Sequence, residues 1–383
     1  MNIHTSFALT VAIACGGFAR AAAPPHPTPS SIAADEQRRT DAYAAQLERF
    51  LRDRMVKGYP KRAAKAWARD YSSVEAFLKS VEPNRSRWRA VIKPPVLHRT
   101  GPLVRRPHPP LAALRAEWLV VPLDTPLTAE ALLVLPKTAT PQAPAPLVIA
   151  QHGIGSCPER TFGLLDHGDH YHSYARALVD AGFAVLAPMN LRSVPRRNRI
   201  EHFCRLLDTS LPGIELVRLQ RLLDDVLADP RIDGDRVGMW GVSLGGMATM
   251  FWMPLESRIK AGVVCAWFNH RLNKMSGEDR RYSSFNRGGE DHAFFTGWMT
   301  EFADHDAAAL ICPRPLLVQT GKKDGIAHWK GVVEEFRKAR THYERLGIAD
   351  RIEMDLHEGG HEARVTSGVR FLTRWLKQSR RPR

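Results

Sequence analysis

The sequence predicts an α/β protein with a mostly parallel central sheet, helices on both faces of that sheet, and a helical arm at the N-terminal end. Short apolar segments, typical of buried parallel strands, alternate with segments of helical spacing from about residue 117 to residue 377. A Gly-x-Ser-x-Gly motif at Gly241–Gly245 lies between one such strand and one such helix. This alternation implies right-handed crossovers and places functional residues beyond the C-terminal ends of the strands.

The expected elements follow from the spacing of their apolar residues. Strands are expected at residues 118–123, 131–135, 147–150, 183–187, 237–240, 261–266, 315–319 and 351–356. Helices are expected at residues 171–181, 213–228, 330–346 and 363–376, with one more beginning at residue 246. Helical spacing also covers residues 35–57, 63–68 and 74–81, and the following prolines break the pattern until strands begin near Glu117. Trp67, Phe77 and Trp88 are expected to be packing anchors, whereas residues 270–309 look irregular.

The N-terminus has the composition of an export signal. Phe7–Ala14 is apolar but too short to span a bilayer, and Ala19-Arg20-Ala21 fits a cleavage site. We therefore expect a signal peptide at 1–23, a proline-rich linker at 24–34, the helical arm at 35–115 and the main α/β domain at 116–378. The mature protein is expected to be exported, periplasmic or secreted, with no integral membrane span. A lipid-anchored form through Cys15 is the alternative.

The chain is strongly basic, with a formal net charge of +15. A solvated basic surface is one interpretation, and attraction to an anionic partner such as an acidic glycan is the other. The arginines are scattered and no aromatic-rich basic module is present, so no nucleic-acid partner is expected.

The cysteines and histidines bear on disulfide bonds and metal binding. Cys265 and Cys312 are expected in the core, whereas Cys157 and Cys204 lie in loops and could form a disulfide in an oxidising compartment. The histidine-rich segment Asp166–His172 fits no zinc spacing, so neither a metal nor a cofactor is expected.

Ser243 is the candidate nucleophile, since its motif has the strand–turn–helix context of a nucleophile elbow. A serine hydroxyl needs a base, and the base needs an orienting acid. Asp324 follows the strand at 315–319, and His361 follows the strand at 351–356, so the order is serine, acid, histidine. Weaker candidates for the acid and base roles are Asp291, Asp304, Asp306, His357 and Glu358.

Acyl transfer also needs hydrogen-bond donors for the oxyanion. The backbone N–H of Leu244, directly after the nucleophile, is one candidate. The N–H of Ile154, in the glycine-flanked turn after the strand at 147–150, is the other. His152 is expected to support this turn rather than to transfer protons.

Several segments resemble α/β-hydrolases, nearer to the branch of dienelactone hydrolases and acetyl-xylan-esterase-like proteins than to lipases. The matching segments are Gln151–Gly155, Asp229–Asp233 with Arg236–Gly238, Gly241–Gly246, Pro313–Val318 with Gly321–Asp324, and Gly359–Glu362. The resemblance implies the α/β-hydrolase fold and the triad. Dienelactone hydrolases proper use a cysteine nucleophile, from which Ser243 departs. Glucuronoyl esterases carry an arginine soon after the serine, where this chain has Leu244-Gly245-Gly246.

The resemblance predicts a serine carboxylic-ester hydrolase that forms an acyl-enzyme, with a small-molecule or polysaccharide ester as substrate. A short acyl or acetyl group on a carbohydrate is the expected target. One alternative is a serine peptidase of the prolyl-oligopeptidase type; another is an inactive glycan-binding protein. Substrate contacts are expected from Trp267, His270, Trp298, Phe302, Arg192, Arg196 and Arg197, and plain packing is the alternative for the aromatic residues.

Overall fold

The computed structural model describes residues 28–165, 170–287 and 289–378. The predicted signal peptide with Cys15, residues 24–27 of the proline-rich linker and residues 166–169 of the histidine-rich segment lie outside these ranges. The rest of the predicted linker is helical from Pro29 onward. Residues up to Leu51 and residues from Arg52 onward form two separate compact units. Within the described ranges no helix is long and apolar enough to cross a membrane.

One sheet of nine strands organises the second unit, in the order β1-β2-β3-β5-β4-β6-β7-β8-β9. The strands are β1 (Val104–Pro107), β2 (Glu117–Pro122), β3 (Thr128–Val134), β4 (Ala145–Gln151), β5 (Ala184–Pro188), β6 (Ile232–Val242), β7 (Ile259–Cys265), β8 (Leu316–Gly321) and β9 (Ile352–His357). The three strands at the β1 edge are antiparallel, and the strands from β5 to β9 run parallel. The predicted mostly parallel sheet is therefore confirmed.

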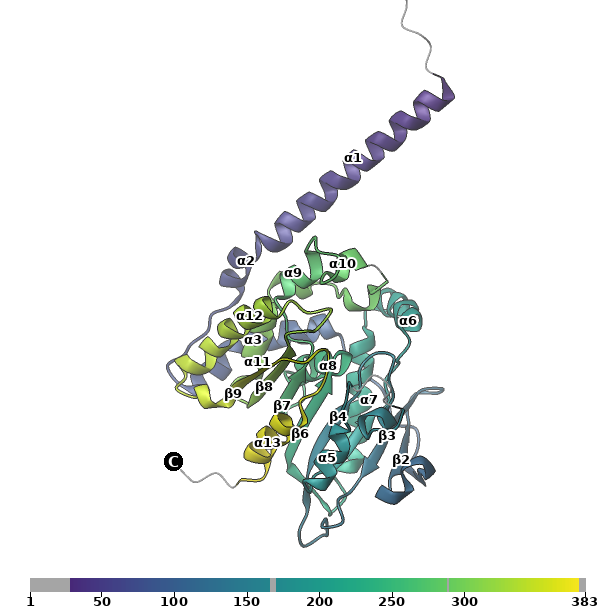
Figure 1. Ribbon diagram of the computed structural model, residues 1–383, viewed down its shortest axis with the longest axis vertical. Coiled ribbons are helices and arrows are strands. Elements are labelled where there is room, and N and C mark those ends of the chain that lie inside the picture. The colour runs from purple at the N-terminus through teal and green to yellow at the C-terminus, as the bar shows by residue number, and fades with distance from the viewer. Residues whose placement is uncertain (1–27, 166–169, 288, 379–383) are drawn as a thin grey trace, which may run out of the picture. The chain divides into compact units, whose positions relative to one another are not determined.

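Helices cover both faces of the sheet, and alternate residues of β4 show why both faces are apolar. Val148 packs in one core with side chains of α5 (Tyr174–Asp180) and α13 (Val365–Leu376). Leu147 packs in the larger core on the other face, with α7 (Leu211–Val226), α8 (Leu244–Trp252), α11 (Asp304–Ile311) and α12 (Trp329–Arg345). Figure 1 views the sheet from the side of α5 and α13. A strand buried on both faces reads as a continuous apolar run, which explains why these strands were predictable.

The N-terminal helices are longer than predicted. They are α1 (Pro29–Val56), α2 (Tyr59–Ala66) and α3 (Val74–Ile92). The end of α3 was predicted at residue 81 because a proline interrupts helical hydrogen bonding, yet the helix continues through Pro83. Trp88 and Ile92, both fully buried in the larger core, lie beyond that proline, and their burial offsets the lost bond. Trp67, Phe77 and Trp88 are buried, as predicted for packing anchors.

Three further expectations are corrected. The first strand is β1, thirteen residues before Glu117, where Arg105 and Glu117 form an ion pair across the β1–β2 ladder. The arginine-rich segment after β5 is a helix, α6 (Val194–Leu206). The segment expected to be irregular contains helices α9 (Arg271–Ser276) and α10 (Ser284–Arg287), together with α11.

The remaining elements are short. They are α4 (Pro158–Thr161) and the 3-10 turns η1 (Pro109–Leu114), η2 (Asp291–Ala293), η3 (Trp298–Thr300) and η4 (Ala349–Arg351). Cys157, Cys204, Cys265 and Cys312 are all free thiols, so the disulfide weighed for Cys157 and Cys204 does not form.

Candidate active site

Ser243 sits on a sharp turn between β6 and α8, with φ = 58° and ψ = −117°. A positive φ is strained for a residue with a side chain, and here the turn raises the hydroxyl at the end of the strand. A Cβ on Gly241 would lie 1.9 Å from the Gly245 carbonyl oxygen, and one on Gly245 would lie 2.1 Å from that of Gln151. The two glycines are therefore required by close backbone approach. Between residues 241 and 250, Ser243 is the one residue that is not buried.

Asp324 and His361 form a bonded pair. His361 Nδ1 lies 2.8 Å from Asp324 Oδ2, and Asp324 is 2% exposed. The other carboxylate oxygen accepts from the backbone N–H of Ile326 at 2.9 Å. Burial acts to raise the pKa of Asp324, but the hydrogen bond and charge of His361 outweigh it, so the pKa lies below its ordinary value. An ionised carboxylate holds the Nδ1 proton in place and leaves Nε2 as the free base of the imidazole.

The loops that carry Asp324 and His361 are locked together by their backbones. The N–H of Lys323 donates to the Gly359 carbonyl at 2.9 Å, and that of Lys322 donates to the His357 carbonyl at 2.8 Å. A Cβ on Gly321 would lie 2.1 Å from the carbonyl oxygen of Gly360, so only glycine permits this approach.

Cys265, at the end of β7, connects the nucleophile to the histidine loop. Its carbonyl accepts from the Ser243 N–H at 2.9 Å, and its thiol donates to the Glu362 carbonyl at 3.1 Å. The thiol is fully buried, and burial holds its pKa well above the ordinary value. Cys265 is therefore an uncharged residue that bonds to the backbone of Ser243 and to that of Glu362, next to His361. Its burial agrees with its predicted core position.

The predicted oxyanion turn lies against the nucleophile. A Cβ on Gly153 would lie 3.2 Å from Ser243 Cβ, and the Gly153 N–H donates to the Tyr171 hydroxyl at 2.8 Å. Among the described residues, no hydrogen-bond acceptor contacts the N–H of Ile154 or of Leu244. Two amides next to the nucleophile are thus free to bind an oxyanion.

His152 supports this turn. Its Nε2 accepts from the Asn190 N–H at 3.1 Å, and its Nδ1 lies 2.8 Å from the Gly153 carbonyl oxygen. Complete burial lowers the pKa of His152, which keeps the ring neutral. These contacts agree with the predicted supporting role.

Sequence reasoning missed the groups that hold the histidine loop from outside. His170 Nδ1 lies 3.0 Å from the His361 carbonyl oxygen, and the Ala363 N–H donates to the His170 carbonyl at 2.8 Å. His172 Nε2 pairs with the Glu362 carboxylate at 2.9 Å. The sequence signal for these groups is the histidine-rich segment itself, whose composition first suggests metal binding. In the described part of that segment the histidines make protein contacts, and no cluster there or elsewhere in the described ranges suits a metal ion.

The residues proposed as substrate contacts have different surroundings. Trp298 and Phe302 are each 1% exposed and belong to the larger core, so they are packing residues. Trp267 is partly buried against the same core. His270 caps α9, accepting from the Asn273 N–H at 3.4 Å.

The three arginines proposed as substrate contacts differ in their exposure to solvent. Arg197 is fully buried and pairs with Glu215 at 2.7 Å, which corrects its proposed contact with substrate. Arg192 and Arg196 are exposed. The carbonyl of Arg192 accepts from the Gly155 N–H at 2.9 Å, so Arg192 lies beside the oxyanion turn.

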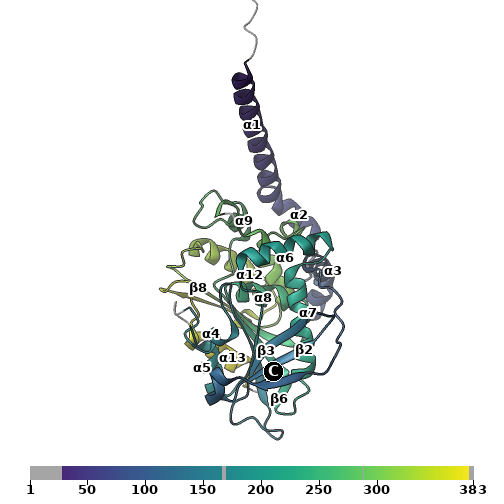
Figure 2. The same cartoon turned by 90° about the vertical axis from the view of Figure 1, so that its right-hand side faces the viewer.

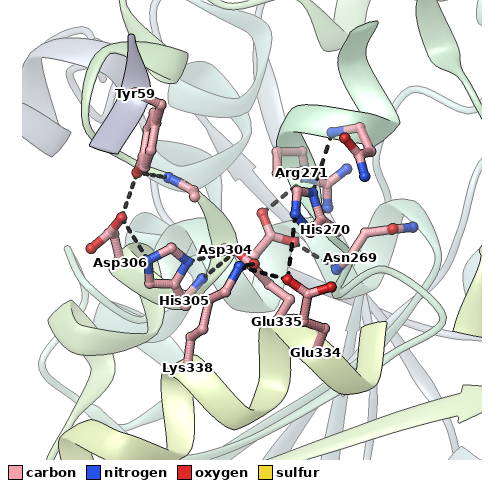
Figure 3. A network of polar contacts seen from close by, with 12 residues as sticks. Tyr59, Asn269, His270, Arg271, Asp304, His305, Asp306, Glu334, Glu335 and Lys338 are labelled. Atoms are coloured by element: carbon pink, nitrogen blue, oxygen red, sulfur yellow. Dashed lines mark hydrogen bonds and ion pairs between the residues drawn. The ribbon is translucent and has the colours of Figure 1, made fainter. Parts of the chain in front are cut away.

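A buried ion pair holds the loop that follows β7. Arg271 binds both carboxylate oxygens of Asp304, at 2.9 and 2.8 Å, and each residue is 1% exposed. Asp304 also accepts from the Asn269 N–H at 2.9 Å (Figure 3). The Arg271 guanidinium lies 4.3 Å from the centre of the Trp267 ring. Since a Cβ on Gly246 would lie 2.8 Å from Trp267 Cβ, this pair supports a loop packed directly on the nucleophile elbow.

A second polar cluster joins α2 to α11 and α12 (Figure 3). The Tyr59 hydroxyl donates to Asp306, which also binds Arg69, and accepts from the Ala303 N–H at 2.6 Å. His305 lies between two carboxylates, 3.2 Å from Asp306 and 2.7 Å from Glu335. Burial acts to lower the pKa of His305, but the bond to Glu335 and the charge of Asp306 raise it overall. Asp304 and Asp306 thus bond to Arg271, Tyr59 and Arg69, whereas the carboxylate bonded to His361 is that of Asp324.

Comparison with known proteins gives one relative by sequence and many by structure. No family model matches the chain. "Putative hydrolase YtaP" of Bacillus subtilis (strain 168) is 29% identical over 276 residues, which cover 68% of this chain and 88% of that protein.

Two solved structures illustrate the structural likeness. The "putative acetyl xylan esterase (BF1801)" from Bacteroides fragilis NCTC 9343 has a TM-score of 0.60 and 18% identity, covering 76% of this chain and 77% of the other. A CE15 glucuronoyl esterase from Teredinibacter turnerae T7901 has a TM-score of 0.55 and 17% identity, covering 82% and 90%. These structures show that the chain has the α/β-hydrolase fold, as the resemblance predicted.

Proposed function

We propose that this protein is a serine carboxylic-ester hydrolase that works through an acyl-enzyme. The observation that carries the proposal is the hydrogen-bonded pair of His361 and Asp324 on the loops after β8 and β9, in the same fold as a serine on a strained strand-to-helix turn. The groups to which we assign roles are Ser243 on its strained turn, the bonded pair of His361 and Asp324, and the two unoccupied amides of Leu244 and Ile154. A nucleophile, a base with its orienting acid, and oxyanion donors are the parts that acyl transfer requires.

The reaction follows from these positions. His361 Nε2 takes the proton of the Ser243 hydroxyl while Oγ attacks the ester carbonyl carbon, and the carbonyl oxygen becomes an oxyanion bound by the two amides. The imidazolium then protonates the departing alcohol as the ester C–O bond breaks. Water, deprotonated by the same nitrogen, releases the acid and restores Ser243. Asp324 keeps its negative charge throughout and stabilises the imidazolium.

We further propose that the substrate is a carbohydrate outside the cytoplasm that carries a short acyl group, such as acetyl, as an ester. Two observations support a small acyl group and a sugar ester. The Gly153 backbone lies against the nucleophile turn, since a Cβ there would lie 3.2 Å from Ser243 Cβ and 3.1 Å from the Tyr171 hydroxyl. Proteins named as acetyl xylan and glucuronoyl esterases share the fold. The predicted export signal agrees with a substrate outside the cytoplasm.

The test is hydrolysis of p-nitrophenyl acetate, butyrate and decanoate, followed by release of acid from acetylated xylan and from a methyl glucuronate ester. We expect turnover that declines with acyl length and is lost in Ser243→Ala. Absence of turnover on every short ester would refute the esterase, and glycan binding without turnover would identify an inactive binder. Cleavage of a prolyl p-nitroanilide without ester cleavage would instead identify a peptidase.

A further inference from the structure

Helix α6 exposes an apolar surface that nothing in the described chain covers. Phe203, Leu206 and Leu207 are 55%, 83% and 77% exposed, and Ile200 is 37% exposed. Their spacing of three, four and seven residues places them along one side of the helix. Large apolar side chains exposed singly are ordinary, but four on one helical face form a patch that marks a binding surface.

Exposed arginines lie at the N-terminal end of the same face of α6. Arg196 and Arg199 share the spacing of the apolar residues, and Arg192 directly precedes the helix; all three are exposed. No carboxylate pairs with any of them within the described residues. Arg197, on the opposite side, is buried against Glu215 instead. The helix thus presents arginines at its first turns and apolar side chains at its end.

One exposed carboxylate lies beside α6, that of Asp291 at 3.4 Å from His202, but within the described residues it pairs with none of Arg192, Arg196 and Arg199. Glu201, the acidic residue of α6, is 1% exposed and accepts from the Leu211 N–H at 2.9 Å. Asp208, which follows the helix, is paired with Lys93. The exposed face of α6 is therefore cationic at one end and apolar at the other.

The position of α6 links this face to the proposed active site. The segment before the helix lies beside the oxyanion turn, through the bonds of the Asn190 N–H to His152 and of the Gly155 N–H to Arg192. Farther along, the Asn198 amide donates to the Gly289 carbonyl at 2.7 Å and fixes α6 on the segment that precedes η2. Figures 1 and 2 place α6 at the same end of the sheet as α9.

We propose that α6 binds the surface of a bilayer that contains anionic lipids. Arginine side chains meet the phosphate headgroups, and the four apolar side chains enter the boundary between headgroups and acyl chains. A carbohydrate would leave Leu206 and Leu207 uncovered. A second copy of the chain would bury three arginines without a carboxylate on the opposing face. Bound in this way, the protein would hold its oxyanion turn close to the membrane.

The test is co-sedimentation of the full-length chain with phosphatidylcholine vesicles, with and without 30% phosphatidylglycerol. We expect binding that requires the anionic lipid and weakens in high salt. Leu206→Ser/Leu207→Ser and Arg196→Gln/Arg199→Gln should each lower the apparent affinity by about tenfold. Leu78→Ser/Leu165→Ser serves as the control, because these exposed apolar residues, at 38% and 61%, belong to segments other than α6; its binding should not change.

Three results would overturn the proposal. One is equal binding by the wild type and the Leu206→Ser/Leu207→Ser variant. Another is binding lost only in Leu47→Ser/Phe50→Ser, which would assign it to the exposed apolar side chains of α1. The third is a dimer in light scattering without lipid that Leu206→Ser/Leu207→Ser abolishes, which would make α6 a contact between copies. None of these readouts depends on esterase activity, so the proposal can fail while the proposed function stands.

Discussion

Two adjoining regions of the molecule are stabilised by different interactions. One comprises the turn and loops that carry Ser243, Asp324 and His361, called here the triad edge. The other comprises the loops and helices of residues 267–306, called here the wall. Main-chain groups and glycines fix the triad edge, as where Gly241 meets Gly245 and Gly321 meets Gly360. Buried charged side chains fix the wall, through Arg271 with Asp304 and His305 with Glu335. Main-chain contacts require glycine at particular positions, whereas ion pairs require only two partners that meet in the fold.

Backbone packing and side-chain ion pairs differ in how tightly they fix the position of a group. A turn fixed by backbone packing places its side chain within narrow limits, which suits a nucleophile. A wall fixed by side-chain pairs can change shape through a few substitutions. The first region therefore suits the chemical step proposed for Ser243.

The largest expected effect tests the triad as a unit. Ser243→Ala and His361→Gln should each lower kcat for the best ester by roughly 10⁴- to 10⁶-fold, because each removes a participant in the same proton transfer. The double variant should be no slower than the worse single variant. Multiplying losses, measured by steady-state kinetics, would show that the two residues act independently.

Breaking the buried ion pair of the wall should be the next largest effect. Arg271→Leu leaves Asp304 buried without its cation, and we expect a loss of about 3–5 kcal/mol in the free energy of unfolding. Arg340→Leu removes an exposed pair with Glu344 and should cost less than about 1 kcal/mol. Urea unfolding measures both. An equal cost for the two variants would contradict the distinction between the regions.

A matched pair of glycines tests the backbone-held edge. Gly321→Ala places a methyl group 2.1 Å from the Gly360 carbonyl oxygen, whereas nothing lies within 4 Å of a Cβ on Gly325. Gly321→Ala should lose about 1–3 kcal/mol of stability together with esterase activity, and Gly325→Ala should lose neither. Similar activity and melting temperatures for the two variants would refute backbone control of the acid loop.

The smallest expected effect is a change with pH in the stability that His305 of the wall contributes to the fold. Because the folded pKa of His305 is raised, its imidazolium stabilises the fold fully below the unfolded pKa of about 6.5. That contribution disappears as the pH rises through the folded pKa. From pH 6 to pH 9 the wild type should lose more stability in urea than His305→Gln does. Parallel curves for the two proteins would show that His305 does not contribute in this way.

The same contrast explains what the sequence predicted. The strands from β2 to β9, Ser243, Asp324 and His361 were predictable because each belongs to a local pattern: an apolar strand, a Gly-x-Ser-x-Gly turn, or a polar residue after a strand. The exposed strand β1 has no such pattern. The bonded pair of Asp324 and His361 agrees with the predicted order. The catalytic roles themselves stay predictions until the variants are measured.

Nonlocal contacts account for what sequence reasoning missed. Arg271 and Asp304 lie 33 residues apart, and Tyr59 and Asp306 lie 247 residues apart, so no spacing rule relates them. For Trp298 both a substrate contact and plain packing stay open from the sequence, because an aromatic residue in a segment without clear periodicity can serve either role, and its burial decides for packing. Helix α6 was missed because its apolar side chains face solvent, which removes the inward-facing stripe that usually reveals a helix.

The thiol of Cys265 has a further consequence for reagents. It lies between Ser243 and the histidine loop, but it is buried, hydrogen-bonded and protonated. Alkylating agents and mild oxidants attack thiolates that they can reach, and Cys265 offers them neither charge nor access. The proposed site should therefore react with fluorophosphonates at Ser243 while resisting iodoacetamide and peroxide. An enzyme with this profile keeps its activity in an oxidising environment without needing a disulfide to protect the thiol nearest its nucleophile.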